Sequence, residues 1–160
     1  MSLEATSRNR LPDGTRLDRP WIESHIPHQG RMCLLDEVLS WDAVRISCRS
    51  MSHRFADNPL RAHGRLGAAC GVEYAAQAMA VHGAVMAQTS GTPARAGLLT
   101  SLRNLILRVI RLDDLDTDLI ASAERVAGDE GSTLYEFTVS SAGRELLSGR
   151  AGIVFGVDRT

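Results

Sequence analysis

The sequence predicts an α+β fold in which an antiparallel sheet curls around one long, buried helix. The first observation is residues 66–86, where nearly every side chain is apolar or small. A helix that is apolar on all sides must be covered by other elements. The second observation is a set of strand patterns on both sides of this segment, joined largely by short turns that favour antiparallel neighbours. A sheet of about five or six strands can cover a single helix only by curling around it.

The elements before the helix are short. Residues 21–26 can form one helical turn, and residues 27–30 form a turn. Residues 32–41 and 44–49 predict a first hairpin or one long bent strand, because apolar and polar side chains alternate cleanly in the second of these segments. An irregular loop at residues 52–65, which contains two histidines, then leads directly into the helix.

The helix carries three polar residues among its apolar ones. Glu73 and Gln77 are four positions apart and therefore lie on one face, whereas His82 faces elsewhere. The segment is long enough to span a membrane, but these three residues argue against a lipid environment. A buried carboxylate without a partner is costly. Glu73 is therefore the first candidate for a functional residue.

Four strand patterns follow the helix. They are separated by segments rich in Gly, Asp and Ser, which are typical of turns. The strands are expected at residues 98–110, 119–126, 133–140 and 146–157. Together with the first hairpin, they supply enough strands to surround the helix.

Length and charge indicate one domain of ordinary size. The chain has 160 residues and a net charge of −1 at pH 7, without the basic surplus of a protein that binds nucleic acid or a membrane surface. Residues 1–19 are polar and show no sustained period, so we expect a loose arm there and a single domain over residues 20–160.

The residue types exclude several chemistries. All 18 basic residues are arginine, which excludes a Schiff-base lysine and a lysine anchor for pyridoxal phosphate, and we expect no cofactor. Cys33, Cys48 and Cys70 lack the spacing of metal ligands and indicate reduced thiols in a cytoplasmic protein. The acidic run at 113–118 lacks the glycine turn and bidentate Glu of a cation loop, so no metal site is expected. The N-terminus also lacks the apolar region of a signal peptide.

Two segments resemble a known family. Residues 26–42, IPHQGRMCLLDEVLSWD, are similar to the opening of the beta-hydroxyacyl-acyl carrier protein dehydratases, where Pro-His precedes a Leu-Leu-Asp-x-Val run. Residues 71–80, GVEYAAQAMA, resemble that family's helix motif, and residues 107–115 stand where the family has a strand and the loop after it. The resemblance covers about residues 26–155 and is greatest to the shorter dehydratase-like subunits of aryl-polyene-type clusters. It implies the hotdog fold, a curled antiparallel sheet around a central helix.

The chain departs from this family at the motif that contains the catalytic histidine. The standard enzymes have His-Phe-Pro-Gly shortly before the helix, and this chain has no such motif. His53 precedes an Asn-Pro pair much as the family histidine does, and His63 is closer to the helix in an unlike context. Either histidine, or neither, can occupy the site. We expect a structural role for His28, in the family-like turn, and a packing role for His82.

Dehydration of a 3-hydroxyacyl thioester needs a base, an acid and a donor for the thioester oxygen. We expect His53 or His63 as the base, because the pKa of histidine lies near neutral pH, and Glu73 as the acid. Unpaired N–H groups at the start of the helix suit the oxygen, glycines there let a ligand approach, and an amide one turn on can orient the acid. The expected substrate-binding residues are Gly67, Gly71 and Gln77.

The leading functional prediction is dehydration of a 3-hydroxyacyl thioester to the 2-enoyl thioester, in fatty-acid or polyene-type lipid synthesis. The acyl group would be linked to an acyl carrier protein or to coenzyme A. Two alternatives stay open. A hotdog acyl thioesterase would use an acidic residue and water on the same scaffold. A non-catalytic partner subunit of an active dehydratase would explain the missing His-Phe-Pro-Gly motif.

The resemblance also implies partners. Hotdog proteins pair through a continuous sheet and place the acyl tunnel at the interface, so we expect a homodimer or a heterodimer with another hotdog subunit. Open sheet edges are usually covered, which supports this independently. Carrier proteins of this class are acidic, and arginine forms forked contacts with phosphate. Candidates to meet a phosphopantetheine phosphate are Arg61, Arg65, Arg103 and Arg108. We expect no nucleic-acid or membrane partner.

Overall fold

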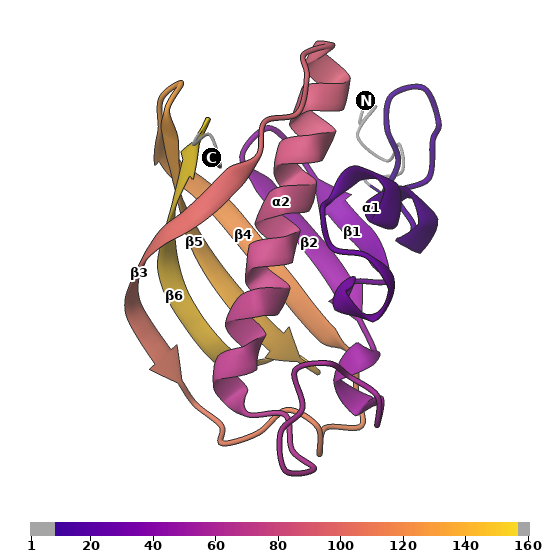
Figure 1. The fold of residues 1–160 in the computed structure, drawn as a ribbon, viewed down its shortest axis with the longest axis vertical. Coiled ribbons are helices and arrows are strands. Elements are labelled where there is room, and N and C mark those ends of the chain that lie inside the picture. The colour runs from indigo at the N-terminus through magenta and orange to yellow at the C-terminus, as the bar shows by residue number, and fades with distance from the viewer. Residues whose placement is uncertain (1–8, 157–160) are drawn as a thin grey trace.

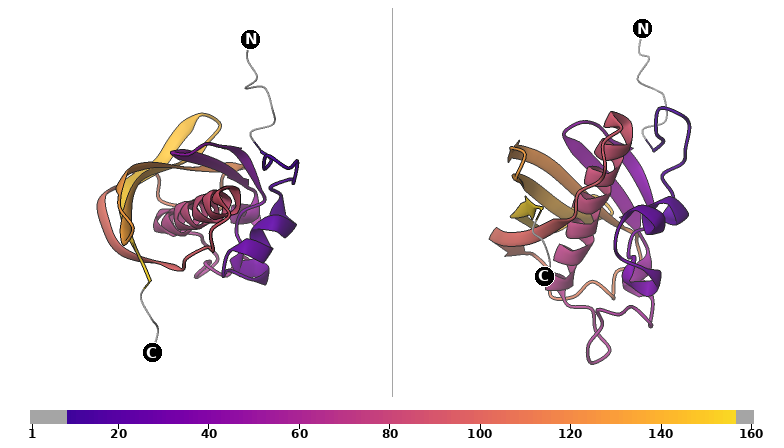
Figure 2. Two further views of the ribbon diagram at one scale, coloured as in Figure 1. Left: turned by 90° about the horizontal axis from the view of Figure 1, so that it is seen from above. Right: turned by 45° about the horizontal axis from the view of Figure 1, so that its top comes forward.

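The protein wraps one long helix in a six-stranded antiparallel sheet (Figure 1), in a computed structural model that describes residues 9–156. The helix, α2 (Gly71–Ser90), lies in the hollow of the sheet. The view along α2 in Figure 2 shows the strands as an arc around it, with α1 (Arg19–His25) beyond the arc on the side of the first strands. This is the α+β hotdog arrangement that the sequence predicts.

The sheet has the order β1-β2-β4-β5-β6-β3, and all neighbouring strands are antiparallel. Short turns join β1 to β2, β4 to β5 and β5 to β6, as the sequence indicates. The strands are β1 (Glu37–Trp41), β2 (Arg45–Ser50), β3 (Gly97–Leu107), β4 (Leu119–Gly128), β5 (Ser132–Ser141) and β6 (Arg144–Phe155). The two edges are therefore β1 and β3.

β3 and β4 are consecutive in the sequence but are not neighbours in the sheet, and the connection between them includes the acidic run at 113–118. The connection between them crosses below the start of α2 (Figure 1). It is held there by backbone hydrogen bonds from Ala68 N–H to Ile110 O (3.0 Å) and from Leu112 N–H to Leu66 O (2.8 Å). Because residues 110–112 pair with the segment that enters the helix, β3 ends at Leu107, earlier than the predicted strand.

The covered side of α2 forms the core with the inner face of the sheet. Tyr74, Ala78 and Val85 are fully buried on the helix. Alanines along this side let the strands approach closely, and each large apolar side chain buried here stabilises the fold by about 1.5–3 kcal/mol. The helix ends where Gly91 adopts φ 69°, a left-handed conformation that glycine accepts at little cost. No helix within residues 9–156 combines the length and apolarity that a membrane crossing requires.

The residues before α1 lie on the first strand. Of the arm expected over residues 1–19, residues 1–8 lie outside the described part of the chain. Leu11 and Leu17 are only 5% and 1% exposed, and Leu17 O accepts a hydrogen bond from Val38 N–H (2.9 Å). The indole Nε1 of Trp41 donates to Arg10 O (3.0 Å). Two leucines at this spacing are enough to pack the segment against β1, although the surrounding sequence is polar.

His82 lies in the core on the far part of α2 and is 1% exposed. Its Nδ1 hydrogen-bonds with the Tyr135 hydroxyl (2.6 Å) and its Nε2 with Asp42 O (2.9 Å). The ring therefore joins the helix to β5 and to the turn between β1 and β2, which agrees with the packing role expected of it. Burial lowers the pKa of His82 because charging the ring would remove an ion from water.

This burial predicts that acid destabilises the fold well above the range in which carboxylates titrate. The unfolded chain binds protons as the pH falls through about 6.5, whereas folded His82 and the similarly buried His53, whose pKa is also lowered, resist protonation. The free energy of unfolding is therefore expected to decrease between about pH 7 and about pH 5.5, by up to about 1.4 kcal/mol per pH unit for each histidine. Urea titrations across this range measure the slope.

Two variants assign the slope to its source. His82→Gln is expected to reduce the pH dependence, because the titrating ring is gone. Tyr135→Phe removes the same hydrogen bond but keeps the ring buried, so its pH dependence should persist. An unchanged slope in His82→Gln would contradict this explanation.

Candidate active site

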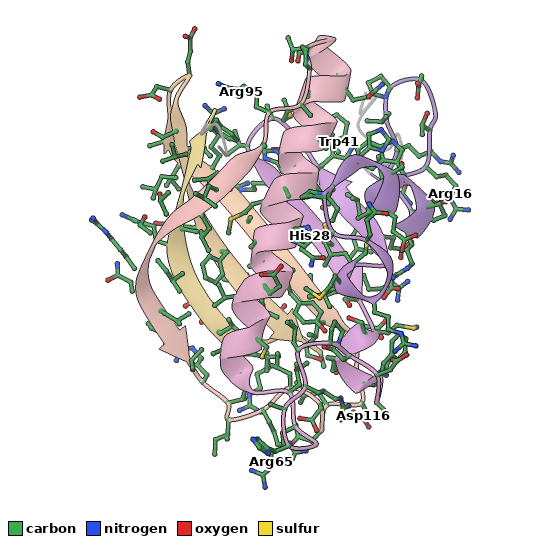
Figure 3. All side chains as sticks on the ribbon, in the orientation of Figure 1. Arg16, His28, Trp41, Arg65, Arg95 and Asp116 are labelled. Carbon is green, nitrogen blue, oxygen red and sulfur yellow. The ribbon has the colours of Figure 1, made fainter. Side chains whose placement is uncertain are left out.

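Glu73, in the first turn of α2, is paired with His28. The Nε2 atom of His28 lies 3.1 Å from Glu73 Oε1, and the two side chains are 27% and 34% exposed. His28 belongs to the turn between α1 and the short 3-10 helix η2 (Gly30–Met32), and Figure 3 shows it beside the middle of the molecule against α2. The helix dipole favours a carboxylate at this end of a helix. The structure thus gives Glu73 a half-buried position with a specific partner.

The two nitrogens of His28 are unequal. Nε2 donates to the carboxylate, because a carboxylate only accepts. Nδ1 is buried and has no hydrogen-bond partner among the described residues. Burial keeps Nδ1 from solvent, and both contacts of Glu73 with described side chains are made by its Oε1.

Gln77 is completely buried beside this pair. Its Oε1 accepts from Leu34 N–H (2.9 Å), and its Nε2 donates to Met32 O (2.7 Å). Nε2 is also 3.4 Å from Glu73 Oε1. The amide thus fixes the segment that follows the His28 turn against α2 and also contacts Glu73.

The structure does not bring His53 or His63 to Glu73, whose polar partners among the described residues are His28 and Gln77. His53 is fully buried, and its Nε2 donates to Leu115 O (3.1 Å), which ties two loops together. His63 lies at the tip of an exposed turn with φ 55°. The structural role expected of His28 stays a prediction, and the structure adds that its Nε2 contacts the Glu73 carboxylate.

Long-range packing decides which histidine contacts Glu73, a point on which the sequence leaves His53, His63 or neither as the candidate. The family pattern indicates a histidine in the loop just before the helix, whereas the histidine that contacts Glu73 comes from the turn after α1. The Pro-His pair in the family-like opening was the one local signal. The Gln77 hydrogen bonds, which join positions more than 40 residues apart, hold the segment that follows this pair against α2.

The glycines at the start of the helix differ from each other. A Cβ at Gly71 would lie 2.5 Å from a methyl of Leu147, so this glycine permits close packing of helix and sheet. Gly67 is exposed, and a Cβ there would meet no atom within 4 Å. A 3-10 turn precedes α2, so Cys70 N–H already donates to Gly67 O (3.0 Å), and Gly71 N–H also has carbonyl partners. Fewer free N–H groups remain here than a bare helix start would offer.

Thiols and metal ligands add no second site in the described part of the chain. Cys33 and Cys48 are buried, and burial raises the pKa of both thiols. Between residues 9 and 156, no group of three or more His, Cys, Asp or Glu side chains is arranged to hold a metal ion. Two of the four arginines expected at a phosphate have acidic neighbours: Arg61 lies 3.8 Å from Asp113 and Arg108 lies 2.9 Å from Glu145.

Solved structures share this architecture at low sequence identity. The dehydratase heterocomplex ApeI:P from Xenorhabdus doucetiae matches with a TM-score of 0.75 and 21% identity, over 84% of this chain and 90% of that chain. Zebra fish thioesterase superfamily member 2 matches with a TM-score of 0.60 and 12% identity, over 86% and 95%. A mutant of thioesterase PA1618 from Pseudomonas aeruginosa matches with a TM-score of 0.54 and 13% identity, over 74% and 79%. These likenesses show the hotdog fold.

The family is shown by sequence. No curated protein matches the chain significantly. The model of the ApeP-like family, described as ApeP dehydratase, matches residues 20–156. With its central helix, its curled sheet and a match that spans nearly the whole described chain, the protein belongs to the ApeP-like dehydratase family.

Proposed function

We propose that the protein removes water from a 3-hydroxyacyl thioester and that Glu73 is the catalytic residue that contacts the substrate. The observation that supports this most directly is the pairing of a half-exposed carboxylate with a histidine whose other nitrogen is buried. Acid–base catalysis requires a titratable group within reach of substrate and held in a fixed orientation. The contact with His28 supports a fixed orientation for Glu73, its partial exposure supports access for a substrate, and the family suggests the reaction class.

The carboxylate can perform both proton transfers. Glu73 accepts the proton from C2, next to the thioester carbonyl, and the electrons of that C–H bond form the C2=C3 double bond. As the bond from C3 to oxygen breaks, the Glu73 carboxylic acid returns the proton to the departing hydroxyl, which leaves as water. The carboxylate is regenerated, so no co-reactant is needed. His28 holds Oε1 throughout, which leaves the other oxygen for the substrate.

We further infer that the acyl group is delivered on an acyl carrier protein and that the chain works as a heterodimer with a second hotdog subunit. The dehydratase that it resembles is a heterocomplex. The edge strand β3 exposes six large apolar side chains, which a monomer in water would leave uncovered. They are Leu98, Leu99, Leu102, Leu105, Ile106 and Leu107, each 36–47% exposed. Pairing through this edge would cover them.

Product analysis separates dehydration from thioester hydrolysis, the alternative on the same scaffold. The purified protein is incubated with a 3-hydroxyacyl thioester of a carrier protein, alone and with a second hotdog subunit. We expect the 2-enoyl thioester to form. Free thiol and 3-hydroxy acid without any enoyl product would favour the thioesterase function. The non-catalytic role would be favoured if this protein by itself forms neither product and the second subunit by itself forms the enoyl product.

Substitutions at the pair test its role. Glu73→Gln keeps the shape but cannot accept the C2 proton, so we expect a loss of about 1,000-fold or more in kcat. His28→Gln should lose about 10- to 100-fold, because the carboxylate loses the donor that orients it. Steady-state kinetics and circular dichroism measure activity and folding together.

The control is His63→Asn, because asparagine tolerates the left-handed backbone of that turn. We expect wild-type activity. A large loss in His63→Asn together with full activity in His28→Gln would contradict the assignment and return the base to the loop before the helix.

Gln77 should act on activity through position. Gln77→Met leaves Leu34 N–H and Met32 O without partners inside the protein, which costs about 2–4 kcal/mol of stability. We also expect kcat to fall more than KM changes, because the His28 segment is no longer fixed beside Glu73. The matched control is Gln88→Met on the exposed end of α2. Equal thermal melts for the two variants would contradict the role of Gln77.

A further inference from the structure

The free edge of the sheet is basic as well as apolar. Residues 91–112, which contain β3, include four arginines and no Asp or Glu. Three of these arginines have partners. Arg95 lies over the Phe155 ring (4.7 Å), Arg108 pairs with Glu145 (2.9 Å), and Arg111 pairs with Asp113. Arg103, near the middle of the strand, has no acidic partner among the described residues.

Arg103 lies at the end of a row of charged residues that crosses the outer face of the sheet. The register of β2, β4, β5, β6 and β3 puts one charged residue of each strand next to that of its neighbour. In this order the residues are Arg45, Glu124, Glu136, Arg150 and Arg103. Within this row, Arg45 pairs with Glu124 (3.1 Å) and Arg150 pairs with Glu136. The single cross-strand neighbour of Arg103 is therefore Arg150, whose charge is already paired with that of Glu136. Like charges directly opposite each other destabilise a sheet.

We propose that β3 pairs with the edge strand of a different hotdog subunit that presents an Asp or Glu beside Arg103, and that Arg103 disfavours pairing with a second copy of this chain. The inference rests on the heterodimer proposed above and names the chemistry that selects its partner. An acidic residue on the adjoining strand would extend the row of opposite charges across the interface. The exposed apolar side chains of β3 would provide apolar contact with either partner, whereas Arg103 would make the acidic partner bind more tightly.

A two-fold pairing of two copies about the centre of β3 would bring two like charges together. β3 has 11 residues, and Leu102 is its central one. An antiparallel, two-fold pairing about Leu102 places the two Arg103 side chains on one face as diagonal neighbours, about 7–8 Å apart. Neither would then have an acidic neighbour. Such like-charge contact is a recognised way to reject a wrong partner.

An Arg103→Glu copy of this chain serves as the acidic partner in a test. Wild-type protein is labelled with one fluorophore and the variant with another, and association is measured by energy transfer for the mixture and for each protein with itself. We expect the mixed pair to associate about three- to tenfold more tightly than either protein with itself. Salt at about 1 M should largely remove this difference, because exposed charges are then screened.

The control is Arg16→Glu, an exposed arginine on the opposite side of the molecule from β3 (Figure 3). It should leave association unchanged. Equal affinities in the mixed and self-paired samples, no association in the mixed sample, or the same effect from Arg16→Glu would each overturn the proposal. The association measurements need no substrate. If the mixed pair binds more tightly but the protein forms no enoyl product, the proposed function is overturned and the proposal on Arg103 stands.

Discussion

The hydrogen bonds of the buried Gln77 amide are the interaction on which the candidate site depends. An amide inside a helix must satisfy its donors and acceptor, and here it does so with Met32 O and Leu34 N–H. These bonds hold the N-terminal segment on the side of α2 that the sheet leaves open. His28, a few residues before the bonded segment, contacts Glu73. The polar stripe in an apolar helix thus contains Gln77, which holds the neighbouring segment, and Glu73, the proposed catalytic residue.

Burial and periodicity made most of the fold predictable. The apolar segment 66–86 indicated a surrounded helix, and alternation predicted β2 and β5 within a residue or so. The crossing of residues 108–118 was not predictable, because it depends on pairing between residues 110–112 and 66–68. The buried leucines 11 and 17 were also missed, since their neighbours are polar. A local sequence pattern indicates which side chains of a segment are buried, but it does not indicate which distant segment packs against them.

The candidate site divides in the same way. Glu73 and Gln77 stood out because polar residues on a buried helix need partners. The identity of the partner depended on tertiary structure, and the family pattern favoured His53 and His63 over His28. His53 instead ties two loops together, and His63 occupies a strained turn. The charge row that ends at Arg103 likewise appears only once strand register is known.

The central claim is that Glu73, held by His28, meets the reacting atoms. A crystal structure of the protein bound to an unreactive analogue, a 3-hydroxyacyl amide in place of the thioester, tests it directly. We predict that the Glu73 oxygen not bonded to His28 lies within about 3.5 Å of both C2 and the 3-hydroxyl group. A ligand whose C2 and hydroxyl lie beside His53 or His63, with Glu73 contacting only His28, would contradict it.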